Sequence, residues 1–298
     1  INSHTDGFVA KYDSLGVYQW GLHIGKTRHW DRFQGISCDS SGNICLSGET
    51  EIIASDERNP ISATLNQNMY VPYLAKIDSA GTMLWQRIIV PAETSRRHGY
   101  SYAVATDSSD NIYITGRSMG YHAYLIKIDS SGDLQWQRKY GNGNEYGHGI
   151  SVDDSDNIYI CGQSQSRDTR IQAFVAKYNS SGVIQWQRHL GYQTSADIFY
   201  DMAIKGSNMY LCGYMQYWSN VDGGNRRVGL LTKLPTDGSF SKGITSTSDY
   251  TAYGEHGGWT YGDPDHNDVD SGEFSVYDYD PTYFDSIGEY RKGNSWYF

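Results

Sequence analysis

The chain has 298 residues, with 34 Asp and Glu against 24 Lys and Arg, which gives a formal net charge of −10. This acidic balance argues against nucleic-acid binding, which requires a basic footprint. No apolar run approaches the roughly 18 residues of a transmembrane helix, so we expect no membrane insertion.

The first predicted element is a β-hairpin over residues 7–23. Its opening stretch, Phe8-Val-Ala-Lys-Tyr12, is rich in β-branched and aromatic residues, as strands are. The turn Asp13-Ser-Leu-Gly16 follows, in which glycine supplies the positive φ of a bulged hairpin loop. Trp20 lies four residues beyond the glycine. The chain begins at Ile1 and not at Met, so a processed chain with repeats removed upstream stays open.

The same phrase recurs along the chain. Clear copies occupy residues 73–81, 124–132 and 174–182, and a weaker one occupies 229–238. The three clear copies are again followed by a tryptophan, at Trp85, Trp136 and Trp186, about 50 residues apart. Each copy predicts a strand, a tight turn and a second strand.

A second phrase stands before each later copy. It covers residues 35–48, 102–116 and 149–162, with a shortened version at 200–213. In Asn157-Ile-Tyr-Ile-Cys161, β-branched and aromatic residues alternate in a way that favours a strand. Together the two phrases give four strands per repeat, which we call a, b, c and d.

Four-stranded units at this period are typical of a β-propeller, because each sheet buries its apolar face only against its neighbours. We therefore predict an all-β fold, a propeller of four-stranded antiparallel blades over residues 1–244. The c–d hairpin at 7–23 would be followed by blades near 34–88, 101–139, 148–189 and 200–244.

The repeats resemble the SBBP family of bacterial and phage β-propeller repeats. The matching sequence motifs are Ala10-Lys-Tyr-Asp13, Gly132-Asp-Leu-Gln-Trp136 and Asp110-Asn-Ile-Tyr-Ile-Thr-Gly116. The resemblance covers residues 7 to about 240. It implies the propeller fold and little about activity, because the family is known mainly from secreted, surface and virion proteins without a shared catalytic site.

Five c strands face only four a–b pairs, so a closed ring needs strands from elsewhere in the chain. The alternating segment 272–280 is the best local donor to complete the N-terminal hairpin. We favour five blades closed by both termini. A four-bladed ring with an appended hairpin, and a partial propeller completed by another chain, are the alternatives.

Residues 245–298 form an acidic extension. They hold eleven Asp and Glu against two basic residues, and thirteen aromatic residues. Disordered acidic tails are poor in aromatic residues, so we expect this one to fold, complete the ring or dock on a partner.

The recurrent Trp20, Trp85, Trp136 and Trp186 are predicted to pack one blade on the next, and a sugar-stacking platform is the alternative. Cysteines have no metal-binding spacing. Cys161 and Cys212 occupy the same slot of strand b and are expected to be small buried residues. Cys38 and Cys45 flank one a–b hairpin, where a disulfide is the alternative.

No cofactor is expected, although the tail contains one acidic loop with oxygen ligands at alternating positions, as a calcium loop has. It departs from the EF-hand pattern, so a solvated acidic loop is the other interpretation. The calcium ligands would be Asp263, Asp265, Asn267, Asp270 and Glu273.

Gly116-Arg-Ser-Met-Gly120 matches the Gly-x-Ser-x-Gly sequence motif of a hydrolase nucleophile elbow. That motif requires a helix after the serine. A strand is predicted there instead, so we do not expect Ser118 to be catalytic.

The d–a and b–c connections emerge on one face of a propeller and are irregular here, as binding loops are. They carry an aromatic and cationic set suited to a glycan or a protein partner. Paired carboxylates for glycoside hydrolysis would have to come from the same loops, where Glu145 and Asp197 are candidates by location. The predicted binding set is Arg28, His29, Trp30, Arg96, Arg97, His98, Tyr146, His148, Tyr217 and Trp218.

The sequence thus favours a noncatalytic extracellular module. We expect a virion appendage, such as a tail fibre or decoration protein, or a bacterial surface component. Its partners would be other virion or surface proteins in an oligomer, with a cell-surface glycan as a further ligand. The alternative is a glycan-active hydrolase or lyase with its site on the irregular face.

Overall fold

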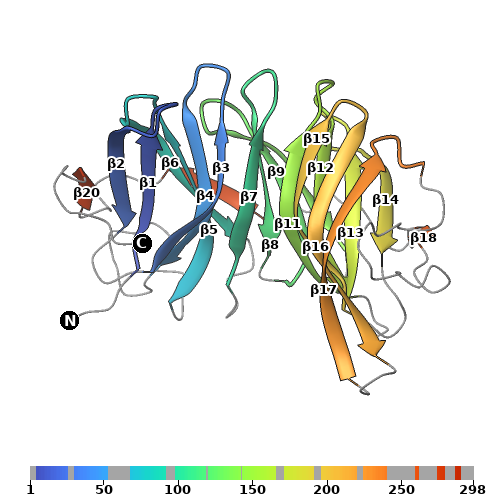
Figure 1. Ribbon diagram of the computed structural model, residues 1–298. Coiled ribbons are helices and arrows are strands. Elements are labelled where there is room, and N and C mark those ends of the chain that lie inside the picture. The colour runs from blue at the N-terminus through green and yellow to red at the C-terminus, as the bar shows by residue number, and fades with distance from the viewer. Residues whose placement is uncertain are drawn as a thin grey trace. The chain divides into compact units, whose positions relative to one another are not determined.

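The computed structural model describes residues 5–25, 30–52, 68–91, 98–118, 120–141, 143–165, 171–190, 196–219, 224–239, 259–261, 274–278 and 286–289. All of the regular structure in these ranges is β-strand, paired antiparallel (Figure 1). The chain forms two compact units, described separately below. The first comprises Ile1–Ser101 and Phe274–Phe298, and the second comprises Tyr102–Glu273.

In the first unit, β1 (Gly7–Tyr12) and β2 (Tyr18–Gly25) form the predicted N-terminal hairpin. A meander of β3 (Asp31–Cys38), β4 (Ile44–Ile52), β5 (Met69–Ile77) and β6 (Met83–Pro91) forms a complete a–b–c–d sheet. Two short tail strands extend these sheets. Strand β19 (Phe274–Asp278) pairs with β6, and β20 (Ser286–Glu289) pairs with β2.

The second unit holds three sheets in chain order. The first is β7 (Tyr100–Thr106), β8 (Ile112–Arg117), β9 (Ala123–Ile128) and β10 (Leu134–Tyr140). The second is β11 (Asn144–Val152), β12 (Ile158–Gln165), β13 (Ile171–Tyr178) and β14 (Ile184–Leu190), with β18 (Trp259–Tyr261) added beside β14. The third is β15 (Ile198–Lys205), β16 (Asn208–Ser219) and β17 (Gly224–Pro235).

The predicted fold class is confirmed: the chain is all-β and built from four-stranded antiparallel propeller blades. One detail of the tail is corrected. Residues 274–278 do form a strand, but it pairs with β6 and not with the N-terminal hairpin, whose added strand is β20. Strand β6 is the last strand of the a–b–c–d meander, so without β19 its outer N–H and C=O groups would lack partners. The number of blades and the closure of a ring remain predictions.

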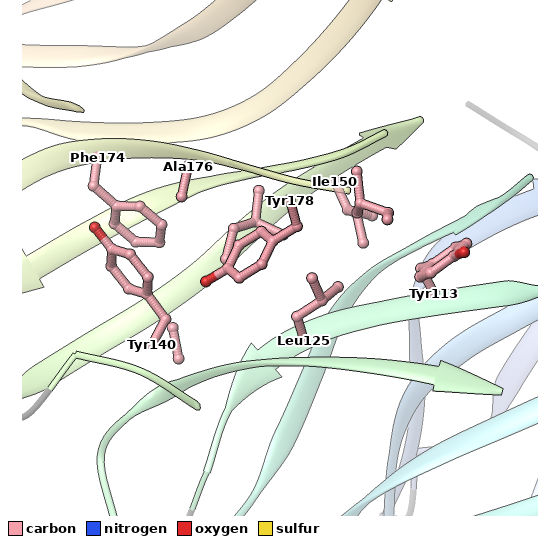
Figure 2. Packing of buried hydrophobic residues seen from close by; sticks show 10 residues of the cluster. Tyr113, Leu125, Tyr140, Ile150, Phe174, Ala176 and Tyr178 are labelled. Carbon is pink, nitrogen blue, oxygen red and sulfur yellow. The ribbon is translucent and has the colours of Figure 1, made fainter. Parts of the chain in front are cut away.

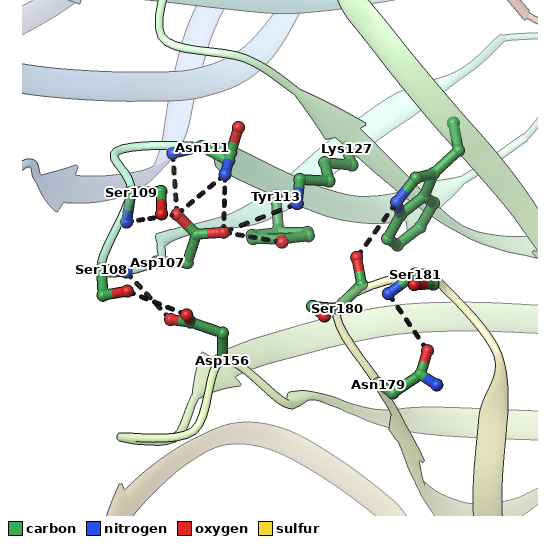
Figure 3. Close-up of polar contacts among 11 residues, drawn as sticks. Asp107, Ser108, Ser109, Asn111, Tyr113, Lys127, Asp156, Asn179, Ser180 and Ser181 are labelled. Atoms are coloured by element: carbon green, nitrogen blue, oxygen red, sulfur yellow. Dashed lines mark hydrogen bonds and ion pairs between the residues drawn. The ribbon is translucent and has the colours of Figure 1, made fainter.

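The a–b turns explain why the two phrases recur together. Asp107 accepts backbone hydrogen bonds from Ser109 and Asn111, both at 2.9 Å. It also accepts the Tyr113 hydroxyl at 2.8 Å and lies 3.7 Å from Lys127 Nζ of strand c (Figure 3). Burial alone would raise the pKa of Asp107, but these hydrogen bonds outweigh it and lower the pKa.

The same arrangement returns in other blades. Asp153 accepts the Tyr159 hydroxyl at 2.9 Å and lies 3.8 Å from Lys177 Nζ. In the first unit, Asp39 forms an ion pair with Lys76 at 2.9 Å. The aspartate of the a–b turn and the lysine of strand c therefore contact each other in three sheets.

Tryptophans on strand d lie against the c–d turn of the following blade. Trp136 Nε1 donates to Ser180 O at 3.3 Å, the contact drawn to Ser180 in Figure 3. A Cβ on Gly182 would come within 3.0 Å of the same indole. Gly182 has a φ of 75°, which only glycine adopts readily. Trp20 donates likewise to Ser79 O at 3.2 Å. Trp186 lies against Gly238, and the half-buried Trp85 lies under Arg87 at 5.2 Å.

Adjacent sheets of the second unit share an aromatic core (Figure 2). Tyr140 of β10 stacks on Phe174 of β13 with ring centroids 4.2 Å apart. Both side chains are essentially buried, as is Tyr178 beside them. Burying a side chain of this kind contributes about 1.5–3 kcal/mol. These sheets therefore bury one another, as the repeat pattern predicts.

None of the four cysteines forms a disulfide bond. Cys38 and Cys45 therefore do not form the disulfide that was the alternative. Cys161 is buried as expected, but Cys212 is exposed, which corrects the prediction for that residue. The described part of the chain contains no helix that could cross a membrane.

Candidate functional site

The structure describes only part of the predicted binding set. Trp30 is 42% exposed, and His98, Tyr146 and His148 are half-buried. Strand β16 carries Tyr217 and Trp218, of which only the backbone is described. The remaining members and the predicted calcium loop lie outside the described residues: Arg28, His29, Arg96 and Arg97, and Asp263, Asp265, Asn267, Asp270 and Glu273.

A β-bulge presents the central residue of the site. The register of β11 with β12 shifts between Gly147 and Gly149, which leaves His148 as the extra residue. The same shift on β15 leaves Tyr200 unpaired between Phe199 and Asp201. A bulge bends the strand and turns its extra side chain away from the regular alternation. Both bulges lie on the edge strands of their sheets.

These side chains join into a row of rings. The centroid of His148 lies 5.3 Å from that of Tyr102 and 5.5 Å from that of Tyr200. Tyr146 stacks 5.7 Å from His148, and Tyr214 lies 5.9 Å from Tyr200. We call Tyr102, Tyr146, His148, Tyr200 and Tyr214 the aromatic ladder. It crosses all three sheets of the second unit.

Arginines contact the ladder at two places. Arg117, at the end of β8, lies 4.0 Å from the ring centroid of Tyr121 and 4.6 Å from that of Tyr146. Arg227, on β17, lies 4.8 Å from the centroid of Tyr214. A guanidinium over an aromatic face is attracted by the ring quadrupole, by about 0.5–1 kcal/mol at exposed sites.

Tyr200 is 50% exposed and Tyr121 is 38% exposed, so two rings of this region face solvent. Burial lowers the pKa of His148, although a hydrogen bond with the Gln163 side chain acts in the opposite direction. The centre of the ladder is therefore an uncharged imidazole at neutral pH. Burial also raises the pKa of Tyr214, with Arg227 opposing it, so its phenol stays protonated.

The first unit has a polar cluster at the corresponding bulge. Gln34 is the extra residue of β3 and donates to Glu49 Oε2 at 2.7 Å. Arg32 forms an ion pair with Glu49 at 2.7 Å. Burial raises the pKa of Glu49, against the opposing effect of these two partners. In the same unit, His98 Nδ1 accepts the backbone N–H of Tyr70 at 3.0 Å.

The two carboxylates considered for hydrolysis are buried and hydrogen-bonded. Glu145 accepts the backbone N–H of Gly143 at 2.9 Å and lies 3.5 Å from His122 Nδ1. Asp197 accepts the backbone N–H of Gln216 at 2.9 Å. Both residues are fully buried. Glu145 thus holds a backbone group just before β11, and Asp197, just before β15, holds one on β16.

Ser118 belongs to a turn. Its Oγ accepts the backbone N–H of His122 at 3.2 Å, and strand β9 follows directly. The serine is buried. No helix follows it, so the nucleophile elbow that the sequence motif would require is not formed. Groups of three or more His, Cys, Asp or Glu arranged to hold a metal are absent from the described residues.

A comparison with protein families found a match to one repeat of the chain. A model of the SBBP β-propeller repeat matches residues 135–168, from β10 through β12. This segment is an SBBP repeat. The SBBP match runs from strand d of one blade into strands a and b of the next, and so includes both Trp136 and the bulge at His148. A search of the curated proteins found no match to the chain.

Six contributors to the ladder region were not predicted from the sequence. One signal was available: Tyr102 and His148 each stand five residues before the turn aspartate of their repeat. Tyr200 has the same place before Lys205. A bulky residue that recurs at one position of the repeat indicates a shared structural role. The others meet only in the folded chain. The six are Tyr102, Arg117, Tyr121, Tyr200, Tyr214 and Arg227.

Proposed function

We propose that this protein is a noncatalytic binding module that holds glycan on the aromatic ladder. The observation that carries the proposal is the run of rings from Tyr146 through His148 to Tyr214 on adjacent blades. Aromatic faces suit the apolar faces of sugar rings, because they bury them without leaving polar groups unpaired. The partly exposed Tyr200 and Tyr121 would make first contact.

Rigid presentation supports this role. The ladder lies on blade strands and their bulges, so its side chains lose little conformational freedom when a ligand binds. Tyrosine adds to this by offering large contact area with few rotatable bonds. A protein partner could use the same surface and is an outcome of the experiment below.

Noncatalytic action is proposed because Glu145 and Asp197 are already engaged by backbone groups. A glycosidase needs two carboxyl groups that face the scissile bond. We further propose that the module works outside the cell, on a virion or a bacterial surface, within an oligomer. The match of residues 135–168 to an SBBP repeat supports the propeller module itself, and the setting rests on the family resemblance described for the sequence.

The experiment is a glycan array, followed by titration of the best ligand against the wild-type protein and the variant Tyr200→Ala. Loss of a central aromatic contact typically costs more than 1 kcal/mol, so we expect affinity to fall about tenfold. Tyr210→Ala is the matched control, because Tyr210 is also an exposed tyrosine of this unit but lies outside the ladder. Its affinity should stay within about twofold of wild type.

Equal binding by wild type and Tyr200→Ala would overturn the placement of the site. A hydrolysis assay on the same sugars tests the enzymatic alternative. Turnover that disappears in Glu145→Gln or Asp197→Asn would overturn the noncatalytic role. A protein ligand without any glycan ligand would overturn the ligand class.

A further inference from the structure

Arg117, the cation beside the ladder, has no counter-ion among the residues that the structure describes. Arg117 has a buried Nε without a hydrogen-bond partner among the described residues. With the described residues it forms neither an ion pair nor a hydrogen bond. Its contacts among them are the ring faces of Tyr121 and Tyr146. Stacking on two rings fixes the plane of the guanidinium while its terminal nitrogens remain available.

Other ring-stacked cations of this unit are used by the fold. Arg138 lies over Trp136 and donates to Gly182 O at 2.8 Å. Arg188 lies over Trp186 and donates to Gly238 O at 3.0 Å. These arginines join consecutive blades. Arg117 forms no comparable hydrogen bond with any described residue, which makes it a candidate for ligand binding.

The neighbouring acid does not neutralise it. Glu145 precedes Tyr146 in the chain, yet its carboxylate is fully buried against Gly143 and His122. A second cation, Arg227, lies over Tyr214 and likewise forms no ion pair within the described residues. The ladder therefore combines sugar-sized aromatic faces with two cations held in fixed positions.

We propose that the ligand is an acidic polysaccharide, with a carboxylate or sulfate group bound by Arg117 and sugar rings stacked on the tyrosines. This inference rests on the proposed function and adds the ligand's charge to it. A planar guanidinium matches a carboxylate or sulfate in bidentate geometry, and charge-assisted hydrogen bonds are about twice as strong as neutral ones. Arg227 would meet a second anionic group of the same chain.

The experiment compares charged and neutral forms of the same sugar chain. Calorimetry would measure the binding of tetragalacturonic acid against its fully methyl-esterified form. A sulfated galactan oligosaccharide against its desulfated form separates the two anions. We expect at least one acidic form to bind about tenfold or more tightly than its neutral counterpart. The preference should shrink as salt rises, because exposed charges are screened.

Variants assign the preference to one residue. Arg117→Gln should abolish the difference between acidic and neutral forms, while Arg117→Lys should keep part of it, because lysine keeps the charge and loses the planar fork. Lys205→Gln is the matched control. It removes the same charge from an exposed residue at the a–b turn of the third sheet and should leave the preference unchanged.

The outcomes separate this inference from the function beneath it. Equal affinity for acidic and neutral forms overturns the inference and leaves glycan binding standing. Binding to neither overturns both. A preference that persists in Arg117→Gln overturns the role of Arg117, as does tight binding of a polyglutamate peptide without the sugars. The wild-type comparison needs no variant, so it decides the matter even if Arg117→Gln does not fold.

Discussion

At the scale of residues, one carboxylate organises the a–b turn in three sheets, where it is Asp39, Asp107 or Asp153. Asp107 gathers backbone and side-chain donors from its own turn and faces a lysine from strand c. It is buried, so the loss of its charge would leave several donors without a partner. Asp107 contacts Lys127, and Asp153 contacts Lys177 in the same way. The aspartate and the lysine recur together in the repeats because the two side chains contact each other in the folded chain.

We predict that Asp107→Ala destabilises the protein by about 2–4 kcal/mol, because breaking a buried, hydrogen-bonded charge leaves its partner uncompensated. Urea unfolding would measure it. Asp129→Ala is the control, since Asp129 caps a c–d turn in the same way but outside the core. It should cost about 1 kcal/mol. Equal losses for the two variants would contradict the account.

His148 gives stability a pH dependence. Its pKa is below the ordinary value in the folded protein, so between the folded pKa and about 6.5 only the unfolded chain is protonated. Stability therefore falls as pH is lowered below 6.5. His148→Gln should remove this component, and urea midpoints of both proteins between pH 7 and 5 would show it. Parallel pH curves for the two proteins would refute the prediction.

At the scale of elements, strand β11 carries the bulge that presents His148. Its flanking glycines are tightly packed: a Cβ on Gly147 would clash with Thr115 Oγ1, and one on Gly149 would come within 2.9 Å of Asp201 Cα. The absence of side chains there lets three sheets approach one another beneath the ladder. The position of the bulge on β11 therefore depends on how closely Gly147 and Gly149 pack against the neighbouring sheets.

We predict that Gly147→Ala costs about 1–3 kcal/mol through overpacking and also weakens glycan binding, because β11 must shift. Adding Thr115→Ala removes the clashing hydroxyl and should restore part of both. Thermal unfolding and titration of the single and double variants provide the measurement. Independent, additive losses in the double variant would rule out this contact as the cause.

Strands were predictable and the ladder was not. The period-2 pattern and the Asp-Ser-Ser-Gly turns define the hairpins locally, so β11 and β12 follow from sequence alone. A bulge breaks that period by one residue, and its signature is not distinguishable from ordinary alternation. The pairing of Arg117 with Tyr146 depends on two blades meeting, which local patterns do not encode. Glu145 and Asp197 were found by position, but their burial was not foreseen.

At the scale of the whole molecule, the tail protects edges of the first unit. Strand β19 covers the outer side of β6, and β20 covers the outer side of β2. Uncovered edge strands are templates for pairing with other chains. The sequence located the donor segment at 272–280 but assigned it to a different partner strand, because pairing between distant segments leaves no local signal.

We predict that deletion of residues 273–298 lowers the melting temperature and changes the mass of the particle in solution, by dissociation of an oligomer or by aggregation through the uncovered edges. Differential scanning calorimetry and light scattering would measure these. Removal of residues 292–298 alone is the control, because it leaves both tail strands in place. An unchanged melting temperature and mass after the larger deletion would contradict the protective role.

We propose that the rings on adjacent blades form one glycan-binding surface. A crystal structure of the protein with the tightest oligosaccharide from the array tests it most directly. We predict sugar rings stacked on Tyr200 and Tyr121, with the chain following the ladder. Sugar bound at another surface, with the ladder uncovered, would contradict the claim.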